Sequence, residues 1–257
     1  MAELTDAITF LGTAGARFVV AHQFLASGGA WLSCGNTQIL FDPGPGCLVQ
    51  ATKRKFDPSK LEAIILSHKH LDHSGDINIM IEAMADGGRT KKGIVFTPAD
   101  ALDQDPVILS YLRSYLENIE VLSEGGCYKV NDITFETPIR HRHGVETYGF
   151  IFRTPRHTFS WITDTMYFND LPGYYVGELL IINVVMLSPK APVEHLSLPE
   201  AKEIIEQVKP KKAILTHFGM TMWRAKPWEL ARKLTEETGI PVIAARDGMR
   251  FDLAQLK

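Results

Sequence analysis

The sequence predicts an α/β fold, and three observations lead to that prediction. Short apolar runs of strand length recur along the 257-residue chain, and segments with helix-end signals lie between them. An apolar share of 45% is enough to bury a full core, so we expect a single domain over residues 1–257. Several of the apolar runs end in a histidine or an aspartate, which is typical of a site assembled at one edge of a sheet.

The expected strands are short runs rich in apolar, β-branched and aromatic residues, bounded by glycine, proline and polar residues. In chain order they are residues 7–11, 30–34, 37–41, 62–66, 93–96, 120–122, 133–137, 148–153, 158–163, 179–183, 213–216, 242–245 and 249–253.

Three helices are expected between these strands. Residues 76–85 follow a histidine-rich segment. Residues 199–208 begin with Ser197-Leu198-Pro199-Glu200, a capping-box pattern. Residues 228–238 follow a proline and stop at a glycine, the usual signals of a helix start and end.

The histidine-rich segment is Ser67-His68-Lys69-His70-Leu71-Asp72-His73, directly behind a buried apolar strand. In a turning segment His68 and His70 project to one side, and Asp72 and His73 round the turn toward a second position. Imidazole and carboxylate ligands suit zinc, manganese or iron, and the absence of thiolates argues against a closed structural zinc site. The alternative is a solvated histidine-rich loop.

Further metal-capable side chains end other expected strands. His143 lies between residues 133–137 and 148–153, Asp164 follows residues 158–163, and His217 follows residues 213–216. Each has an ordinary alternative, because an aspartate after a strand is often a turn or cap residue and a lone histidine is often structural. Together with the histidine-rich segment they support one metal site.

The order and spacing of these motifs resemble the metallo-β-lactamase superfamily. The resemblance rests on Phe10-Leu11-Gly12-Thr13, Ile39 to Gly44, the His68-x-His70-x-Asp72-His73 motif, His143, Thr163-Asp164-Thr165 and Thr216-His217. It implies a four-layer αββα sandwich. It also implies His68, His70 and His143 on one metal, Asp72, His73 and His217 on a second, and Asp164 bridging both.

The cofactors expected from this resemblance are two divalent metal ions, zinc first, with manganese or iron as alternatives. Two such ions lower the pKa of a bridging water and polarise a substrate oxygen, so the expected reaction is hydrolysis by a metal-bridging hydroxide. Asp72 is expected to hold the proton of that hydroxide while it ligates. His195 is expected to protonate the leaving oxygen, because a similar His-Ser/Thr element before the same helix is found in ribonuclease Z and related phosphodiesterases. The alternative is that His195 caps or packs at the helix entrance.

The branch of the superfamily is indicated by the surroundings of two ligands. A β-lactamase of the commonest kind has a cysteine at the position of Asp164, so antibiotic hydrolysis is not expected. His143, with Gly149 and Phe150 behind it, resembles the ribonuclease Z and small-phosphodiesterase branch. One departure is Asn183, which stands where ribonuclease Z has the glutamate that would support His195.

The expected function is therefore a phosphodiesterase acting on a small phosphodiester or nucleotide-type substrate. The alternatives are a lactonase or thioesterase, a ribonuclease acting on RNA ends, a di-iron oxidoreductase, and a binding module without catalysis. The complete ligand set argues against the binding module.

Residues beside the ligands have less certain assignments. Asp42 is expected to orient a ligand or a loop rather than to bind metal. His141 competes with His143 as ligand, and the spacing to Gly149 selects His143. His141 is then a supporting or an exposed residue. Phe218, Met220 and Trp223 are expected to be core residues, with an apolar wall for an aromatic substrate group as the alternative.

Composition limits the partners. The net charge is −3 and the pI about 6.3, so no global basic character points to nucleic acid or an anionic membrane. The basic runs at residues 53–55 and 89–92 are expected to be solvated loops. We expect a small-molecule substrate and no membrane association, and we leave nucleic acid binding and a homo-oligomer open.

The three cysteines, Cys34, Cys47 and Cys127, are too few and too scattered for a disulfide framework. The N-terminus has no basic region followed by an apolar run, and no stretch of transmembrane length is apolar throughout. A cytoplasmic location is therefore expected.

Overall fold

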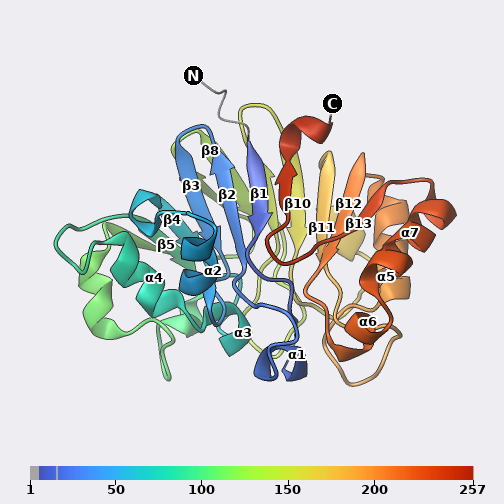
Figure 1. The fold of residues 1–257 in the computed structure, drawn as a ribbon, viewed down its shortest axis with the longest axis horizontal. Helices are drawn as coiled ribbons and strands as arrows, with labels where there is room; N and C mark the ends of the chain where they lie inside the picture. Colours follow the sequence, from blue (N-terminus) through green and yellow to red (C-terminus); the bar gives the residue numbers. More distant parts are fainter. Residues whose placement is uncertain (1–5, 16, 257) are drawn as a thin grey trace.

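Two β-sheets face each other, and helices cover the outer face of each, in the computed structural model, which describes residues 6–15 and 17–256 (Figure 1). The four-layer αββα sandwich predicted for the chain is confirmed. Each sheet has seven strands. The first contains, in spatial order, β14 (Arg250–Asp252), β1 (Ala7–Phe10), β2 (Ala30–Cys34), β3 (Thr37–Phe41), β4 (Ala63–Ile65), β5 (Ile94–Thr97) and β6 (Asn118–Val121). The second contains β13 (Val242–Ala244), β12 (Lys212–Thr216), β11 (Leu179–Asn183), β10 (Thr158–Ile162), β9 (Phe150–Arg153), β8 (Ile133–Thr137) and β7 (Gly126–Val130).

Parallel strands occupy the corresponding part of each sheet. In the first sheet β3, β4, β5 and β6 run parallel, and in the second β10, β11, β12 and β13 do. Carboxyl ends of parallel strands meet at one edge, where the following loops can assemble a site. In Figure 1 this edge is the lower one, and both ends of the described chain lie at the upper edge.

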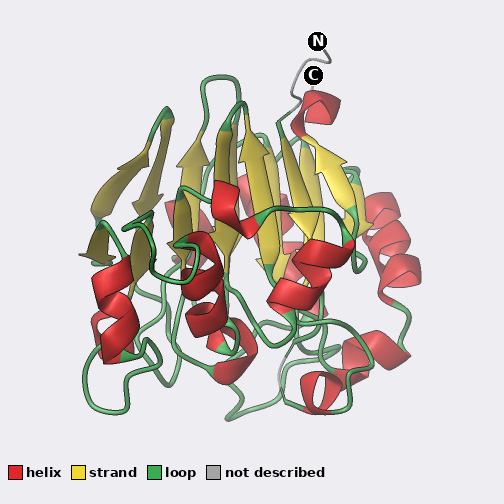
Figure 2. Cartoon of the chain, turned by 60° about the vertical axis from the view of Figure 1, so that its left-hand side comes forward, coloured by secondary structure: helices red, strands yellow, loops and turns green. Residues whose placement is uncertain are grey.

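The helices fall into two layers and a group of short segments. The first sheet is covered by α2 (Cys47–Lys53) and α4 (Ile77–Met84), and the second by α5 (Leu198–Val208) and α7 (Pro227–Thr238) (Figure 2). Three short helices, α1 (Phe18–Ala21), α3 (Leu71–Ser74) and α6 (Met220–Arg224), lie at the lower edge. Among the described residues, no helix combines the length and apolarity needed to span a membrane.

Strand alternation separates the core into layers. Phe41 points between the sheets, where its ring stacks on Trp161 at a centroid distance of 4.4 Å. Its neighbour Leu40 points to the outer face and packs in the cluster that includes Met80 of α4. A similar outer layer joins the second sheet to α5 and α7 through residues such as Ile205. These three buried layers hold the sheets and helices together and so position the lower edge.

Comparison with the expected elements shows one missing strand and several missing helices. The strand β7 was not predicted; it is an edge strand in which only Val130 is buried, so it lacks the apolar run of a buried strand. The short helices α1, α2, α3 and α6 were also missed, because helical periodicity is not detectable over so few residues. All three cysteines are free, as their spacing predicted.

Candidate metal centre

The side chains selected from the sequence meet at the lower edge of the sandwich. The His68–His73 segment follows β4, His143 lies in the connection between β8 and β9, Asp164 follows β10, and His217 follows β12. His195 comes just before α5. The structure brings all of these candidates together, in three overlapping groups whose potential ligand atoms lie within 4.8 Å of one another.

The first group consists of His68, His70 and His143. His143 Nδ1 donates to the carbonyl oxygen of Glu194 at 2.9 Å, so its Nε2 carries the lone pair. That Nε2 lies 3.0 Å from His70 Nδ1. The Ser67 hydroxyl donates to Asp42 and therefore accepts from His68 Nδ1 at 3.0 Å, which leaves a lone pair on His68 Nε2. This buried Nε2 has no hydrogen-bond partner among the described residues.

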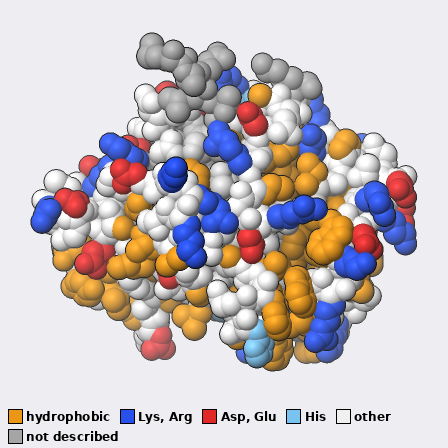
Figure 3. All heavy atoms as spheres, in the orientation of Figure 1, with side chains coloured by type: hydrophobic (Ala, Val, Ile, Leu, Met, Phe, Trp, Pro, Cys, Tyr) orange, Lys and Arg blue, Asp and Glu red, His pale blue; other side chains and the backbone are white. Residues whose placement is uncertain are grey.

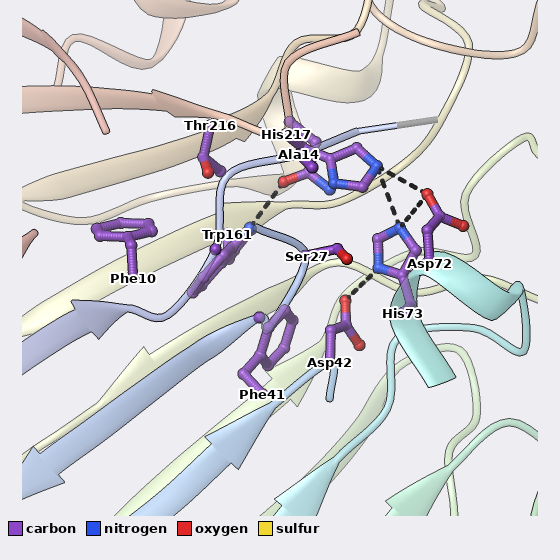
Figure 4. Close-up of a pocket in the computed structure, with 13 residues that line it drawn as sticks. Phe10, Ala14, Ser27, Phe41, Asp42, Asp72, His73, Trp161, Thr216 and His217 are labelled. Carbon is purple, nitrogen blue, oxygen red and sulfur yellow. Dashed lines mark hydrogen bonds and ion pairs between the residues drawn. The ribbon is translucent and has the colours of Figure 1, made fainter. Parts of the chain in front are cut away.

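The second group consists of Asp72, His73, Asp164 and His217. His73 Nε2 lies 3.2 Å from His217 Nε2. An Asp72 oxygen lies 3.7 Å from the first of these nitrogens and 3.5 Å from the second. Figure 4 shows the three side chains turned toward one another above the pocket between the sheets.

Asp164 lies between the two groups and uses its two oxygens differently. Asn183 Nδ2 donates to Oδ1 at 2.9 Å, which fixes the carboxylate plane. Oδ2 lies 3.3 Å from Nε2 of both His73 and His217, and 3.9 Å from His68 Nε2. One oxygen therefore faces ligands of both groups. Asn183, expected to leave His195 unsupported, supports Asp164 instead.

The charges of the second group strongly shift its proton affinities. Although burial lowers the pKa of His217, the Asp164 carboxylate raises it to about 9. Burial also lowers the pKa of His73, but the Asp72 and Asp42 carboxylates outweigh burial and raise this pKa well above its usual range. Burial raises the pKa of Asp164, yet the imidazoles of His217 and His195 hold it well below the ordinary value. In the absence of metal, His73 and His217 therefore favour the protonated, positively charged form beside the carboxylates.

The first group has the opposite character. Burial, together with the neighbouring His73, lowers the pKa of His68 well below its usual value. Burial and then His143 lower the pKa of His70. The imidazoles of His68 and His70 are therefore neutral at neutral pH, and the potential ligand nitrogens of the group lie close together. The donor set of nitrogen and carboxylate oxygen, with an unpartnered buried nitrogen, fits a divalent cation in each group.

Asp42 positions His73, as the sequence suggested for a residue that orients a ligand. One carboxylate oxygen accepts from the Ser67 backbone N–H at 2.6 Å. The other accepts from the Ser67 hydroxyl at 2.7 Å and lies 2.8 Å from His73 Nδ1. This contact directs His73 Nε2 toward the second group, as Figure 4 shows. Asp42 has a positive φ of 47°, a conformation that aspartate and asparagine tolerate better than most residues.

We expect Asp42→Asn to weaken metal binding in the second group by about 10- to 100-fold, because an amide holds the His73 tautomer less firmly than a carboxylate. Asparagine keeps the size and the backbone conformation, so the fold should persist. Competition with a chromophoric chelator measures the affinity. Unchanged affinity in this variant would show that His73 does not depend on Asp42.

His217 also has a positive φ, of 60°, and its loop packs tightly against a glycine. A Cβ at Gly15 would lie 2.2 Å from the His217 carbonyl oxygen and 2.8 Å from its ring carbon Cδ2. Only glycine permits this approach. The glycine therefore supports the unusual backbone that turns the His217 ring into the site.

His141 is neither a ligand nor exposed. Its ring is buried, with Nε2 2.5 Å from the Tyr175 hydroxyl and Nδ1 3.2 Å from the Asp164 carbonyl oxygen. Burial lowers its pKa to about 4, so the ring is neutral. His141 thus packs behind Asp164, and the spacing argument that selected His143 as the candidate ligand agrees with the geometry.

His195 faces the centre from the entrance to α5. Its Nδ1 lies 3.5 Å from Asp164 Oδ2 and has no hydrogen-bond partner within the part of the chain that the structure describes. Its ring lies 5.0 Å from that of His143. The helix itself is capped by Ser197 and Glu200, which form the predicted capping box. Capping therefore does not require His195, and its imidazole remains available to the site.

Metal binding in the second group should release protons and strengthen with rising pH. Because the pKa of His217 is about 9 without metal and that of His73 is also raised well above its usual value, a cation must displace protons, and the affinity should increase at least up to pH 9. The low pKa values of His68 and His70 predict much weaker pH dependence in the first group. Calorimetry in buffers of different ionisation enthalpy counts the released protons; none released at pH 7.5 would contradict this assignment.

The same raised pKa affects the stability of the metal-free protein. A group whose pKa is raised by folding stabilises the fold below its ordinary pKa of 6.5, and that contribution is lost as the pH rises through about 9. The melting temperature of the metal-free protein should therefore fall between these values.

Comparisons with known proteins identify the family of the chain. The family described as "Beta-lactamase superfamily domain" matches residues 37–218. An uncharacterized protein from Methanocaldococcus jannaschii is 30% identical over 255 residues, which cover 96% of this chain and 94% of that protein. Ribonuclease Z from Bacillus mycoides is 28% identical over 115 residues, 43% of this chain and 37% of that enzyme.

Two solved structures share the fold. The metallo-beta-lactamase fold protein YhfI from Bacillus subtilis has a TM-score of 0.80 and 19% identity, over 96% of this chain and 99% of that one. A diphosphatase from the PhnP family has a TM-score of 0.72 and 18% identity, over 96% and 97%. The chain belongs to the metallo-β-lactamase superfamily, as its motifs predicted.

Proposed function

We propose that this protein is a dinuclear metal-dependent phosphodiesterase that acts on a small phosphodiester or nucleotide-type substrate. The observation that carries the proposal is the position of Asp164 Oδ2, which faces imidazole nitrogens of His68, His73 and His217 at 3.3–3.9 Å. A single oxygen in that position suits a ligand shared by two cations. Zinc fits the nitrogen and oxygen donors best, with manganese and iron as alternatives.

Two divalent ions held there would lower the pKa of a water molecule and polarise a phosphoryl oxygen. His68, His70 and His143 would hold one ion, and Asp72, His73 and His217 the other. Asp72 is the more exposed of the two carboxylates, at 17% against 1% for Asp164. We assign Asp72 to accept the proton of the attacking water.

His195 is assigned to protonate the leaving oxygen. It approaches from the helix side, next to His143 and Asp164 and outside both sets of assigned ligands. A phosphodiester anion beside this imidazole would favour its protonated form. An unpartnered nitrogen at the edge of the centre is suited to donate a proton to an oxygen that departs there.

Two further considerations support a phosphodiester substrate. The relatives that match include a ribonuclease Z, and the solved structures that share the fold include a diphosphatase; both names describe cleavage of phosphorus esters or anhydrides. The net charge of −3 does not favour a large polyanion such as folded RNA, so a small substrate is the better match.

The test is a substrate panel on protein that has been stripped with a chelator and reloaded with Zn or Mn. The panel contains bis-p-nitrophenyl phosphate, a nucleoside p-nitrophenyl phosphodiester, a short RNA, a lactone and a thioester. We expect turnover of the two small diesters that disappears on chelation and returns with metal. Turnover of the lactone or thioester instead would replace the proposal by the corresponding hydrolase, and cleavage of RNA alone would replace it by a ribonuclease. The exposed-histidine variant His22→Ala serves as a control that should keep full activity.

A further inference from the structure

A second cavity lies beside the metal centre and is not needed by the chemistry proposed above. Its volume is about 380 Å³, which is large enough for a small organic ligand. It opens between the start of α7, the helix α6 and the segment that follows β13. Figure 3 shows hydrophobic side chains gathered over this lower right part of the surface, with lysine and arginine side chains at their edge.

Three aromatic side chains form part of the cavity wall. Trp223, Trp228 and Phe218 line it. Trp228 is 50% exposed although it is a large apolar residue. The Trp223 ring is held by Phe24, which stacks on it at 4.9 Å with an interplanar angle of 8°. A rigid indole and an exposed indole together form a surface on which a flat ring can stack.

The polar end of the cavity carries an available positive charge. Asp247 is occupied, because its oxygens accept from the Thr13 backbone N–H, the Thr13 hydroxyl and the Ala26 backbone N–H at 2.7–2.9 Å. Arg246 lines the same end and is exposed, and no ion pair or hydrogen bond of its guanidinium is found within residues 6–15 and 17–256. Arg246 is therefore the group at this end that is free to pair with an acidic ligand, while the Asp247 carboxylate beside it is engaged by three hydrogen bonds.

The cavity and the metal centre lie on opposite faces of two paired segments. Ala14 and Phe218 form a parallel bridge, and Phe218 N–H donates to the Thr13 carbonyl at 2.8 Å. Thr13 and Phe218 line the cavity, whereas their neighbours Ala14 and His217 line the pocket at the metal centre. The cavity is thus a separate site, although it contacts the segment that positions His217.

We propose that this cavity binds a planar aromatic anion, with its ring against Trp223 and Trp228 and its acidic group on the Arg246 guanidinium. Aromatic faces favour a flat ring, and a free guanidinium favours a carboxylate or phosphate. The proposal is independent of the proposed function, because neither metal nor the candidate ligands take part in it. A ligand there would press on Phe218, which directly follows His217 in the chain.

The experiment uses the full chain without metal, so that no metal ion coordinates the probe. Binding of 2-naphthoate is measured by calorimetry and by quenching of tryptophan fluorescence, with the neutral 2-naphthamide as comparison. We expect Trp228→Ala and Arg246→Gln each to weaken naphthoate binding by about 10-fold, and the amide to bind about 10-fold more weakly than naphthoate. Trp228→Phe should restore most of the affinity that alanine removes. A parallel titration with a nucleoside monophosphate distinguishes a phosphate from a carboxylate as the acidic group.

Two controls make the result specific. Arg89→Gln removes an exposed arginine from the other half of the molecule and should leave binding unchanged, as should Asp164→Ala in the metal centre. Equal binding of naphthoate and its amide would overturn the anionic part of the proposal. Binding that survives both Trp228→Ala and Arg246→Gln, or the absence of binding in the wild type, would overturn the site itself. The proposal would also be overturned if the wild type were a dimer that bound no naphthoate and dissociated in Trp228→Ala. A second copy of the chain would then occupy the cavity.

Discussion

Replacing Asp164 by alanine should reduce phosphodiester turnover by roughly three orders of magnitude, a loss of about 4 kcal/mol in transition-state stabilisation. The substitution removes the oxygen that faces His73 and His217 at 3.3 Å, and it leaves the Asn183 amide without its acceptor. The centre should then hold one metal ion or none. Elemental analysis of the dialysed protein, together with kcat on bis-p-nitrophenyl phosphate, checks both parts.

A surface aspartate provides the matched control for this variant. Asp103 is exposed and lies outside the centre, so Asp103→Ala should keep both metal content and turnover. Circular dichroism and the melting temperature of Asp164→Ala show whether the fold persists. A folded Asp164→Ala that keeps its full metal content and its turnover would show that Asp164 does not bridge the two groups.

Replacing His195 by alanine should lower kcat by about 10²- to 10⁴-fold, the usual range for a lost general acid, without changing metal content. The loss should depend on the leaving group. A p-nitrophenolate departs without a proton, whereas an alkoxide needs one, so diesters with alkyl leaving groups should lose most activity. Turnover of a series of diesters with leaving groups of increasing pKa measures this dependence in both proteins.

The result separates two roles of His195. A steeper dependence on leaving-group pKa in His195→Ala identifies proton donation. An equal loss for every leaving group would contradict it and leave His195 as a residue that packs at the entrance of α5. Rescue of alkyl diester cleavage by added imidazole would be a further sign of proton donation.

Much of the fold could be predicted because buried strands leave a strong signal. β4 is buried on both faces and reads as a continuous apolar run. β3 ends in an apolar residue directly before Asp42, and β10 ends in an apolar residue two positions before Asp164. β7 was not predictable in this way, since an edge strand such as Gly126–Val130 exposes much of its surface to solvent. The pairing order of the strands is a property of the packed sheets and was not predicted; the resemblance to a known family gave only the four layers.

The candidate site was predictable to a similar extent. Its metal-capable side chains are rare residue types at the ends of apolar strands, so their positions in the chain are enough to select them. Groups that hold the ligands in place through the backbone or through common side chains give no such signal in the sequence. The Glu194 carbonyl that fixes the His143 tautomer is a backbone group, and Ser67 is a common residue. The support that Asn183 gives Asp164 depends on packing between β10 and β11, which only the fold brings together.

Metal stoichiometry tests the central claim most directly. Protein stripped with a chelator and titrated with Zn²⁺ in a calorimeter, with elemental analysis of the product, should bind two ions per chain. Asp42→Asn should weaken the binding step of the second group, and Asp164→Ala should abolish at least one of the two. A wild-type protein that binds a single ion, or binds two that are unaffected by both substitutions, would contradict a dinuclear centre bridged by Asp164.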